Sequence, residues 1–382
     1  MKKINLKNDH LQLYKRENSE FWQIKFKLPN KKSIRKTSGT KIIEDAKKIA
    51  LSIYDKEKKY NKAKLSFTKS YYYKSFHLIE SKGLLKKEIE CFLSEAVKYI
   101  KFNKEILKKS DLLKGRTVFN LFFEDSTRTR TSFEVAAKRL GADLINVAVK
   151  DSSINKGETL LDTMTTINSM SPDVLIVRHP EEGISKKISK IVKACVINAG
   201  DGSHEHPTQA LLDALTIKRK FNSFHNLKIA ICGDILHSRV ARSNIEILST
   251  LGATINVIGP QSLIPKNLNN IGVNIYYDMK NGLKNCDIVM MLRIQKERIV
   301  GTHITNEKEY FKKYGLNYKK LAYAKKNAFV MHPGPMNRGV EIETNLADDI
   351  TRSLIQEQVT MGVAIRMACL EILVHNRDKY GL

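Results

Sequence analysis

Short apolar runs recur along most of the chain, and helical patterns separate them. Runs of five to seven mostly apolar residues predict strands at 117–122, 143–149, 173–178, 194–199, 227–233, 253–259, 286–292 and 328–332. Amphipathic helix patterns lie between most of these runs, a helix over 84–102 precedes them, and a long helix over 353–378 follows. Strands that alternate with helices are typical of parallel α/β layers. The order predicts an α/β fold with two doubly wound parallel-sheet lobes of four strands each, and a hinge near 206–225.

The N-terminal part has a different pattern. Residues 11–14 and 21–28 predict strands with nearly alternating faces, and 32–37 predicts a third. A helix is expected over 42–60, and 61–75 has no clear period and is interpreted as a linker. The first 65 residues therefore predict a small α+β module of the type ββ(β)α. One aromatic cluster in it, Phe21, Trp22 and Phe26, looks exposed.

Charge separates this module from the rest of the chain. The net charge is +26 over 382 residues. Residues 1–70 hold 20 Lys and Arg against seven Asp and Glu, a net of +13, and the other 312 residues share the remaining +13. Such asymmetry indicates a nucleic acid or an acidic membrane as partner. The alternative is a general enrichment in Lys, Asn and Ile that selects no partner.

Composition excludes several other classes of protein. No stretch reaches the ~18–20 consecutive apolar residues of a membrane span, and the polar, Lys-rich N-terminus lacks the apolar core of a secretory signal. The cysteines are scattered and form no CxxC pair: Cys91, Cys195, Cys232, Cys286 and Cys369. Neither a zinc site nor a disulfide framework is indicated, and single thiols favour a reducing cytoplasm.

The most informative segment is Phe123–Phe133, which reads FEDSTRTRTSF. It follows an apolar strand and begins an amphipathic helix that ends at Gly141. Free backbone N–H groups and the helix dipole at such a junction favour an anion, and arginines supply forked donors for phosphate. Arg178 and Arg293 each end an apolar strand, so both are expected at the carboxyl edge of a parallel sheet, where ligands bind. His206 and Gln209 are three residues apart at a predicted helix start and share a face.

The segment resembles the carbamoyl-phosphate loop of the aspartate and ornithine carbamoyltransferases. Six further motifs follow in the order of that family: Lys156–Thr159, Arg178–Pro180, His206–Asp213, His237–Asn244, Arg293–Arg298 and His332–Gly339. The resemblance covers roughly residues 73 to 382. The last two motifs are similar to the aspartate branch, and the cysteine motif typical of the ornithine branch is absent at His332–Pro335.

The resemblance implies the domains and substrates. A carbamoyl-phosphate-binding domain would span 73–215, completed by the C-terminal helix within 353–382, and an aspartate-binding domain would span 222–350. The implied substrates are carbamoyl phosphate and L-aspartate. The transfer would proceed by direct attack of the aspartate amine, with phosphate as leaving group and proton acceptor. This chemistry requires no metal or organic cofactor, and no cluster with metal-ligand spacing is visible in the sequence.

The resemblance also implies roles for individual residues. It assigns Arg128, Thr129, Lys156, Arg178 and His206 to catalysis. Carbamoyl phosphate would be bound by Ser126, Thr127, Arg128, Thr129, Arg178, His206, Gln209, Gly334 and Pro335, and by Ser152 from a neighbouring subunit. Aspartate would be bound by Arg239, Arg293 and Gln295, and by Lys156 of the neighbour. Sites shared in this way imply a homotrimer.

Two alternatives stay open at this point. One is a carbamoyltransferase for another acceptor such as ornithine, and the other is a nucleic-acid-binding protein built on a carbamoyltransferase scaffold. Residues 1–65 bear a weak resemblance to the arm-type DNA-binding domain of phage integrases, carried by Leu13–Arg16, Trp22 and Thr37–Thr40. The sequence does not decide whether a regulatory chain or a dihydroorotase associates with the enzyme, nor whether nucleotides regulate it.

Overall fold

Backbone contacts divide the chain after Ser70, into one unit of residues 1–70 and another of residues 71–382. The computed structural model describes residues 3–6, 10–27, 33–66, 70–147, 159–266, 268, 272–294 and 306–380.

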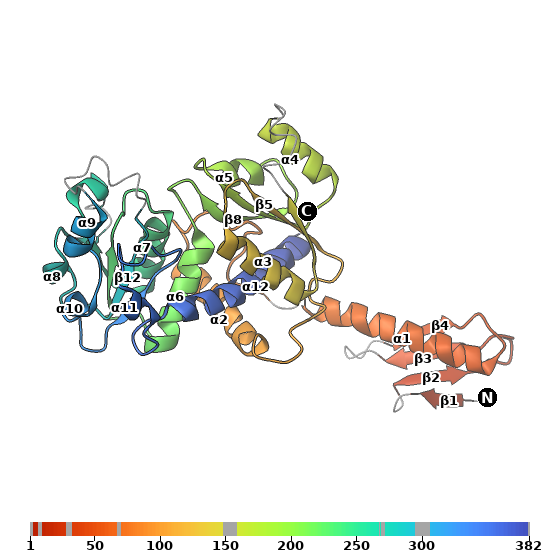
Figure 1. Ribbon diagram of the computed structural model, residues 1–382. Helices are drawn as coiled ribbons and strands as arrows, with labels where there is room; N and C mark the ends of the chain where they lie inside the picture. The colour runs from red at the N-terminus through yellow and green to blue at the C-terminus, as the bar shows by residue number, and fades with distance from the viewer. Residues whose placement is uncertain are drawn as a thin grey trace. The chain divides into compact units, whose positions relative to one another are not determined.

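The N-terminal unit is an antiparallel sheet with one helix packed on it (Figure 1). The strands follow one another in chain order: β1 (Lys3–Leu6), β2 (Leu11–Tyr14), β3 (Gln23–Lys27) and β4 (Ser33–Thr37). Helix α1 (Ile43–Ser66) covers one face of the sheet. Alternate strand residues such as Leu13 and Ile24 are fully buried and pack against Ala46 and Ala50 of α1.

Two expectations for this unit were wrong, and one strand had been missed. Trp22 and Phe26 are core residues, 5% and 1% exposed, and only Phe21 of the predicted aromatic cluster is exposed. The helix continues to Ser66, so the predicted linker begins too early. The strand β1 had not been predicted, although its four residues alternate between polar and apolar as those of β2 do.

The first lobe of the second unit has a parallel sheet in the order β6-β5-β7-β8. Its strands are β5 (Thr117–Phe122), β6 (Asp143–Val147), β7 (Val174–His179) and β8 (Cys195–Asp201). Its helices are α2 (Lys86–Phe102), α3 (Thr127–Leu140), α4 (Leu160–Ser169) and α5 (Ile184–Ser189). Each strand predicted in this part of the chain is present.

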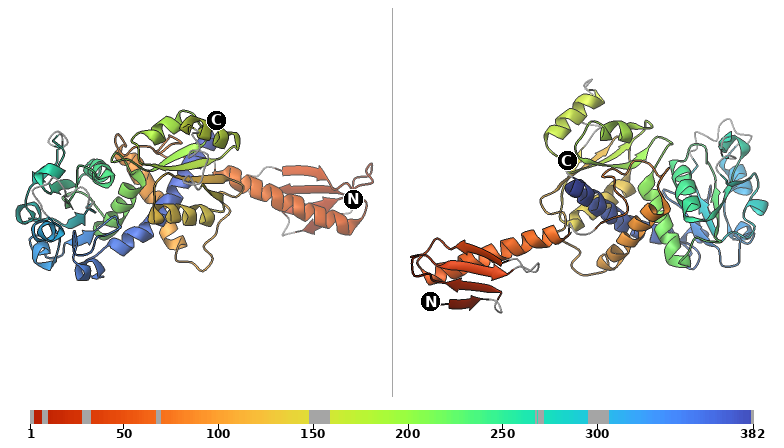
Figure 2. Two further views of the ribbon diagram at one scale, coloured as in Figure 1. Left: turned by 45° about the horizontal axis from the view of Figure 1, so that its top comes forward. Right: turned by 180° about the vertical axis from the view of Figure 1, so that it is seen from behind.

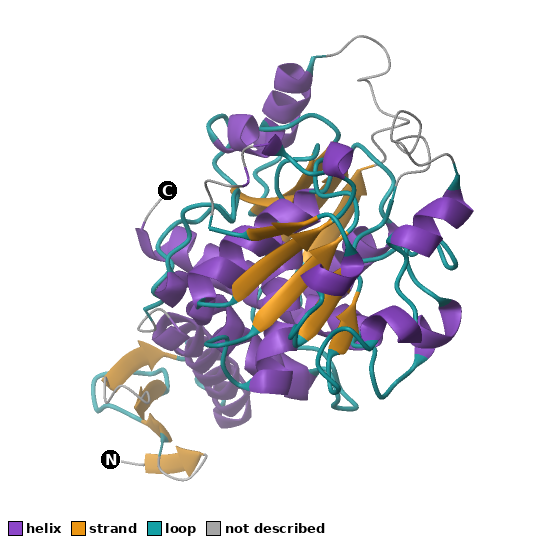
Figure 3. Ribbon diagram, turned by 90° about the vertical axis from the view of Figure 1, so that its left-hand side faces the viewer, coloured by secondary structure: helices purple, strands orange, loops and turns teal. Residues whose placement is uncertain are grey.

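The second lobe has a five-stranded parallel sheet in the order β11-β10-β9-β12-β13. Figure 3 shows strands side by side with helices around them. Its strands are β9 (Lys228–Cys232), β10 (Thr254–Ile258), β11 (Asn274–Tyr276), β12 (Ile288–Met291) and β13 (Phe329–Met331). Its helices are α7 (Arg239–Leu251), α8 (Met279–Gly282), α9 (Glu307–Lys313), α10 (Tyr318–Leu321) and α11 (Thr344–Asp348), with a 3-10 turn at Gln261–Leu263. The prediction of two parallel α/β lobes is confirmed, although β11, a three-residue edge strand, makes the second sheet one strand wider than expected.

Two helices hold the lobes together. Helix α6 (Pro207–Phe221) is continuous over most of the predicted hinge and packs against α7 of the second lobe and α2 of the first. Helix α12 (Ile355–Tyr380) runs along α6, α2 and α3 (Figure 2). By length and composition α12 could cross a membrane, but most of its side chains are buried among these helices, as in the core helix of a soluble fold.

Strand order determines where a ligand can bind. In the first sheet the chain reverses direction of winding between β5 and β7, and in the second between β9 and β12. Open parallel sheets bind ligands beyond the carboxyl ends of the strands at such points.

The core of the N-terminal unit can be tested through Trp22, the only tryptophan of the chain. Its indole N–H donates to the Lys41 carbonyl at 3.2 Å, and its ring is buried. We expect Phe26→Ala to destabilise this unit by about 3–5 kcal/mol, because it removes a fully buried ring. Urea unfolding followed by tryptophan emission measures this change.

Phe21→Ala is the matched control, since that ring is 41% exposed and its loss should have little effect. Equal shifts for the two variants, or a native emission typical of tryptophan in water, would contradict the buried core.

Candidate active site

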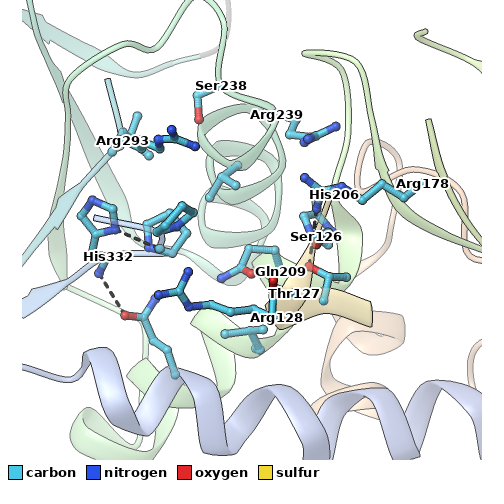
Figure 4. A pocket seen from close by; sticks show the side chains of 18 of the residues that line it. Ser126, Thr127, Arg128, Arg178, His206, Gln209, Ser238, Arg239, Arg293 and His332 are labelled. Atoms are coloured by element: carbon cyan, nitrogen blue, oxygen red, sulfur yellow. Dashed lines mark hydrogen bonds between the residues drawn. The ribbon is translucent and has the colours of Figure 1, made fainter. Parts of the chain in front are cut away.

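A cavity of about 860 Å³ lies between the carboxyl ends of the two sheets. Residues that directly follow β5, β7, β9, β12 and β13 line it, together with the start of α6 and part of α12. Figure 4 shows arginine side chains from both lobes pointing into this space. All described residues that the sequence assigned to the site line this one cavity: Ser126, Thr127, Arg128, Thr129, Arg178, His206, Gln209, Arg239, Arg293, Gly334 and Pro335.

One end of the cavity is formed by the N-terminus of α3. Ser126 precedes the helix in an extended conformation, and its hydroxyl makes no capping hydrogen bond within the described residues. The backbone N–H groups of the first helical turn have no acceptor within the helix, and the turn contains no acidic residue. Arg128 lies in the same turn and forms no ion pair with a described carboxylate. This end of the cavity is suited to a phosphate-like anion.

A single carboxylate connects the two lobes. Glu124 Oε1 accepts from Arg178 Nε at 2.7 Å and from Arg239 Nη2. Arg178 ends β7 of the first lobe, while Arg239 begins α7 of the second. Burial and then the charge of Arg239 lower the pKa of Arg178 to about 10, so this guanidinium is still charged at neutral pH.

Arg178 also reaches the phosphate-like end of the cavity. Its Nη1 lies 3.5 Å from Thr129 Oγ1, at the limit of a hydrogen bond. On the other side, Arg239 Nη1 is buried without an acceptor among the described residues. A buried donor of this kind is costly unless a ligand supplies an acceptor.

His206 is held as a neutral donor. It caps α6, is 3% exposed, and its backbone N–H donates to Ser243 Oγ at 2.8 Å. Burial, followed by the charges of Arg178, Arg366 and Arg239, lowers the pKa of the imidazole well below its ordinary value. The Nδ1 atom has no partner among the described residues, so the ring is available to a bound group.

A buried amide network orients Gln209. Its Nε2 donates to Asp213 Oδ1 at 3.0 Å, and the same carboxylate accepts from Gln358 at 2.7 Å and from Asn244 at 2.8 Å. Burial raises the pKa of Asp213 to about 6, while the three amide donors favour its charged form. The Asp213 carboxylate thus fixes the orientation of Gln209 by accepting from its Nε2.

The loop after β13 closes another wall. Gly334 has φ of +65°, and its N–H donates to His332 Nδ1 at 2.8 Å. The positive φ favours glycine here, and a Cβ at this position would lie 3.0 Å from the Arg128 guanidinium carbon, closer than most side chains allow. The following bond, Gly334–Pro335, is cis. The loop therefore brings its backbone directly against the anion-binding arginine.

Three predicted site residues, Ser152, Lys156 and Gln295, lie outside the described residues. Sequence reasoning also missed two residues that organise the site, Glu124 and Asp213. Both lie inside motifs that were recognised, but an acid among anion-binding groups gave no reason to select it. Among the described residues, no group of three or more His, Cys, Asp and Glu side chains could hold a metal ion.

The fold and the cavity define a two-lobed α/β protein with arginine side chains gathered in the cavity between its sheets. Two family models cover most of the second unit. The model described as aspartate/ornithine carbamoyltransferase, carbamoyl-P binding domain, matches residues 77–219, and the Asp/Orn binding domain of the same family matches residues 225–373. The chain belongs to the aspartate/ornithine carbamoyltransferase family.

Named relatives lie within the aspartate branch. The aspartate carbamoyltransferase catalytic subunit of Rhodospirillum rubrum is 57% identical over 300 residues, which are 78% of this chain and 94% of the relative. That of Granulibacter bethesdensis is 56% identical over 303 residues, 79% of this chain and 96% of the relative. Both alignments leave about a fifth of this chain unmatched.

Solved structures agree with this grouping. Aspartate transcarbamoylase from Trypanosoma cruzi in complex with N-(phosphonacetyl)-L-aspartic acid has a TM-score of 0.69 at 32% identity, covering 78% of this chain and 96% of that one. The same enzyme in complex with carbamoyl phosphate and aspartate gives 0.68 at 31% identity, with the same coverage.

The neutral state of His206 is testable by NMR of ¹³C-labelled histidine rings. A lowered pKa means that the imidazole stays neutral where an ordinary histidine, with a pKa near 6.5, takes up a proton. We therefore expect the His206 ring resonance to stay unchanged as the pH falls through that range. The spectrum of His206→Asn assigns the resonance, and a midpoint at or above 6.5 would contradict the buried cationic environment.

Proposed function

We propose that the chain transfers the carbamoyl group of carbamoyl phosphate to the amine of L-aspartate, giving N-carbamoyl-L-aspartate and phosphate, a step of pyrimidine synthesis. The names of the relatives at 56–57% identity support the reaction. The observation that carries the proposal is the single cavity that gathers donors from the carboxyl ends of both sheets. We expect the reaction in the cytoplasm, which the scattered single cysteines favour.

The phosphate binds at the start of α3. The free N–H groups of that turn, the hydroxyls of Ser126, Thr127 and Thr129, and the Arg128 guanidinium supply donors around one anion. The close approach of Gly334 to Arg128 supports this placement, because it holds the guanidinium against the wall that faces the carbamoyl group.

The carbamoyl oxygen is stabilised by neutral and cationic donors together. Arg178 and Thr129 lie side by side, and the buried imidazole of His206 presents a ring nitrogen to the same cavity. Such preorganised donors act on the charge that develops on the oxygen during attack. Because the pKa of His206 is well below its ordinary value, the imidazole acts as a hydrogen-bond donor and need not act as a base. Gln209, oriented by Asp213, binds the carbamoyl amide.

Aspartate binds through the arginines of the second lobe. A substrate with two carboxylates needs two separate cationic partners, and Arg offers bidentate geometry to each. Arg239 has a buried donor without an acceptor, and Arg293 has no described carboxylate partner. Ornithine has a cationic side chain that these arginines would repel, so they favour aspartate as the acceptor. The family resemblance assigns Gln295 to aspartate binding as well.

The chemical step follows from these positions. The neutral α-amine attacks the carbamoyl carbon, forming the N–C bond and a tetrahedral intermediate. The bond from carbon to the phosphate oxygen then breaks, and the leaving phosphate accepts the amine proton. Alignment of the two substrates and stabilisation of the oxyanion supply most of the rate acceleration.

The active unit is a homotrimer with shared sites. The motif Lys156–Thr159 and Ser152 resemble the family segment that reaches a neighbouring subunit's site, with Lys156 on aspartate and Ser152 on carbamoyl phosphate. Oligomerisation is then part of catalysis.

Substrate choice is tested by assaying carbamoyl transfer to L-aspartate and to L-ornithine, with the full chain and with a chain lacking residues 1–70. We expect aspartate-specific activity in both, because every described residue of the cavity lies in residues 71–382. Transfer to ornithine alone would overturn the assignment of the acceptor. A folded, trimeric full chain that transfers to neither would overturn the enzyme assignment in favour of a scaffold.

Shared sites are tested by mixing two inactive variants, Arg128→Ala and Lys156→Ala. If each site combines Arg128 of one subunit with Lys156 of its neighbour, reassembled 1:1 mixtures regain intact sites in mixed trimers only. Random reassembly predicts roughly a quarter of the wild-type activity. Each variant refolded alone is the control, and mixtures that stay inactive would show that one subunit supplies both residues.

A further inference from the structure

The sheet of the N-terminal unit has two unlike faces. One packs against α1 and forms the apolar core. Along each strand, side chains of the other face alternate with those of the core. No other described element of residues 1–70 covers this second face (Figure 2). Its positions are Lys3, Asn5, Gln12, Tyr14, Gln23, Lys25, Lys27, Ser33, Arg35 and Thr37. We call these ten residues the outer face.

The outer face is polar and purely cationic. It holds three lysines, one arginine and three amides, and none of its ten residues is acidic. The described acidic residues of this unit lie elsewhere, in the turn between β2 and β3 and on α1. Glu20 of the turn pairs with Lys41, and Glu44 of α1 pairs with Lys47. An enrichment in lysine across the whole chain would not by itself separate the two signs of charge in this way. The segregation indicates a polyanionic partner.

Strand register arranges these side chains in rows. Asn5, Gln12, Lys25 and Arg35 are direct partners across β1, β2, β3 and β4. Directly opposed side chains on one face are about 5 Å apart. The amide-bearing strand β2 and the adjacent β3 therefore form the middle of the face, while Lys3 and Arg35 are on the two outer strands.

This arrangement fits duplex DNA. The major groove of B-DNA is about 12 Å wide and admits a two-stranded ribbon, and Gln and Lys are side chains that bind base edges there. Cations on the flanking strands would then lie toward the phosphates on either side. We propose that the outer face binds the major groove of duplex DNA, independently of the carbamoyl-transfer site.

Other polyanions fit less well. Single strands are bound by stacking on aromatic rings, and the outer face has one ring, Tyr14, over which the Arg16 guanidinium already lies at 5.9 Å. Duplex RNA has a major groove too deep and narrow for side chains to reach. A membrane surface takes up apolar side chains, and the outer face has no aliphatic residue.

The test uses the full chain and a fluorescent DNA duplex of about two helical turns, with saturating inorganic phosphate present to occupy the cavity between the lobes. Lys3 and Arg35, the cations of the flanking strands, would each contact a phosphate, so log K should fall with log [salt] with a slope of about −1.8. The variant Lys25→Gln/Arg35→Gln removes one phosphate contact, Arg35, and one cation facing the base edges, Lys25, so its slope should fall to about half and its affinity by at least about tenfold at low salt.

Lys47→Gln/Lys48→Gln on α1 is the matched control, because it removes the same charge from the opposite side of the unit. We expect it to change the affinity by less than about threefold. Carbamoyl transfer and Trp22 emission should be unchanged in both variants, which shows that each is folded. Failure of the enzyme assignment would leave this result unaffected, since the readouts are separate.

Several outcomes would overturn the proposal. Equal weakening by the two variants would mean that net charge alone attracts DNA. Tighter binding to single-stranded DNA, to duplex RNA of the same length or to vesicles containing phosphatidylserine would assign the face to another partner. Absence of salt-dependent binding by the full chain would mean that the outer face binds no nucleic acid.

Discussion

The carboxylate of Glu124, shared between Arg178 and Arg239, is the interaction on which the geometry of the site depends. Two partly buried guanidiniums from different lobes repel each other, and the carboxylate between them replaces that repulsion with two ion pairs. Since Arg178 lies near the carboxyl end of β7 and Arg239 begins the second lobe's α7, the link sets the distance between the anion-binding turn of α3 and the arginines opposite. A residue that contributes no positive charge thus positions the cations that the ligands need.

Burial of the side chains around the cavity also determines their protonation states. Around the cavity, low exposure and nearby arginines keep His206 neutral, and three amides surround Asp213. Helices α6 and α12 supply this dry environment, because they pack along the first lobe and against each other. The same packing explains why α12, apolar over most of its length, is a core helix here. Charge and polarity are therefore fixed before a ligand arrives, which is the arrangement that catalysis by electrostatic stabilisation requires.

The two units of the chain arrange their cationic side chains differently. In residues 71–382 the cations converge on a buried cavity and are partly balanced by acids, an arrangement suited to small anions of defined shape. In residues 1–70 the cations spread over a sheet face that its own helix leaves open, an arrangement suited to an extended polyanion. The contrast follows from strand type. Parallel strands covered on both faces gather their functional groups at one edge, whereas an antiparallel sheet covered on one face presents a whole surface.

The sequence by itself determined the α/β class, nearly all the strands and the family, because apolar periodicity and local motifs such as Ser126–Arg130 depend only on near neighbours in the chain. It did not yield β1 or β11, which are only four and three residues long, nor the burial of Trp22, which depends on α1 packing against the sheet. It passed over Glu124 and Asp213 for a related reason. Apart from Gln209, which is four residues from Asp213, their partners are 31 to 145 residues away in the chain, and only the folding of two sheets against α6 and α12 brings such distant donors to one carboxylate.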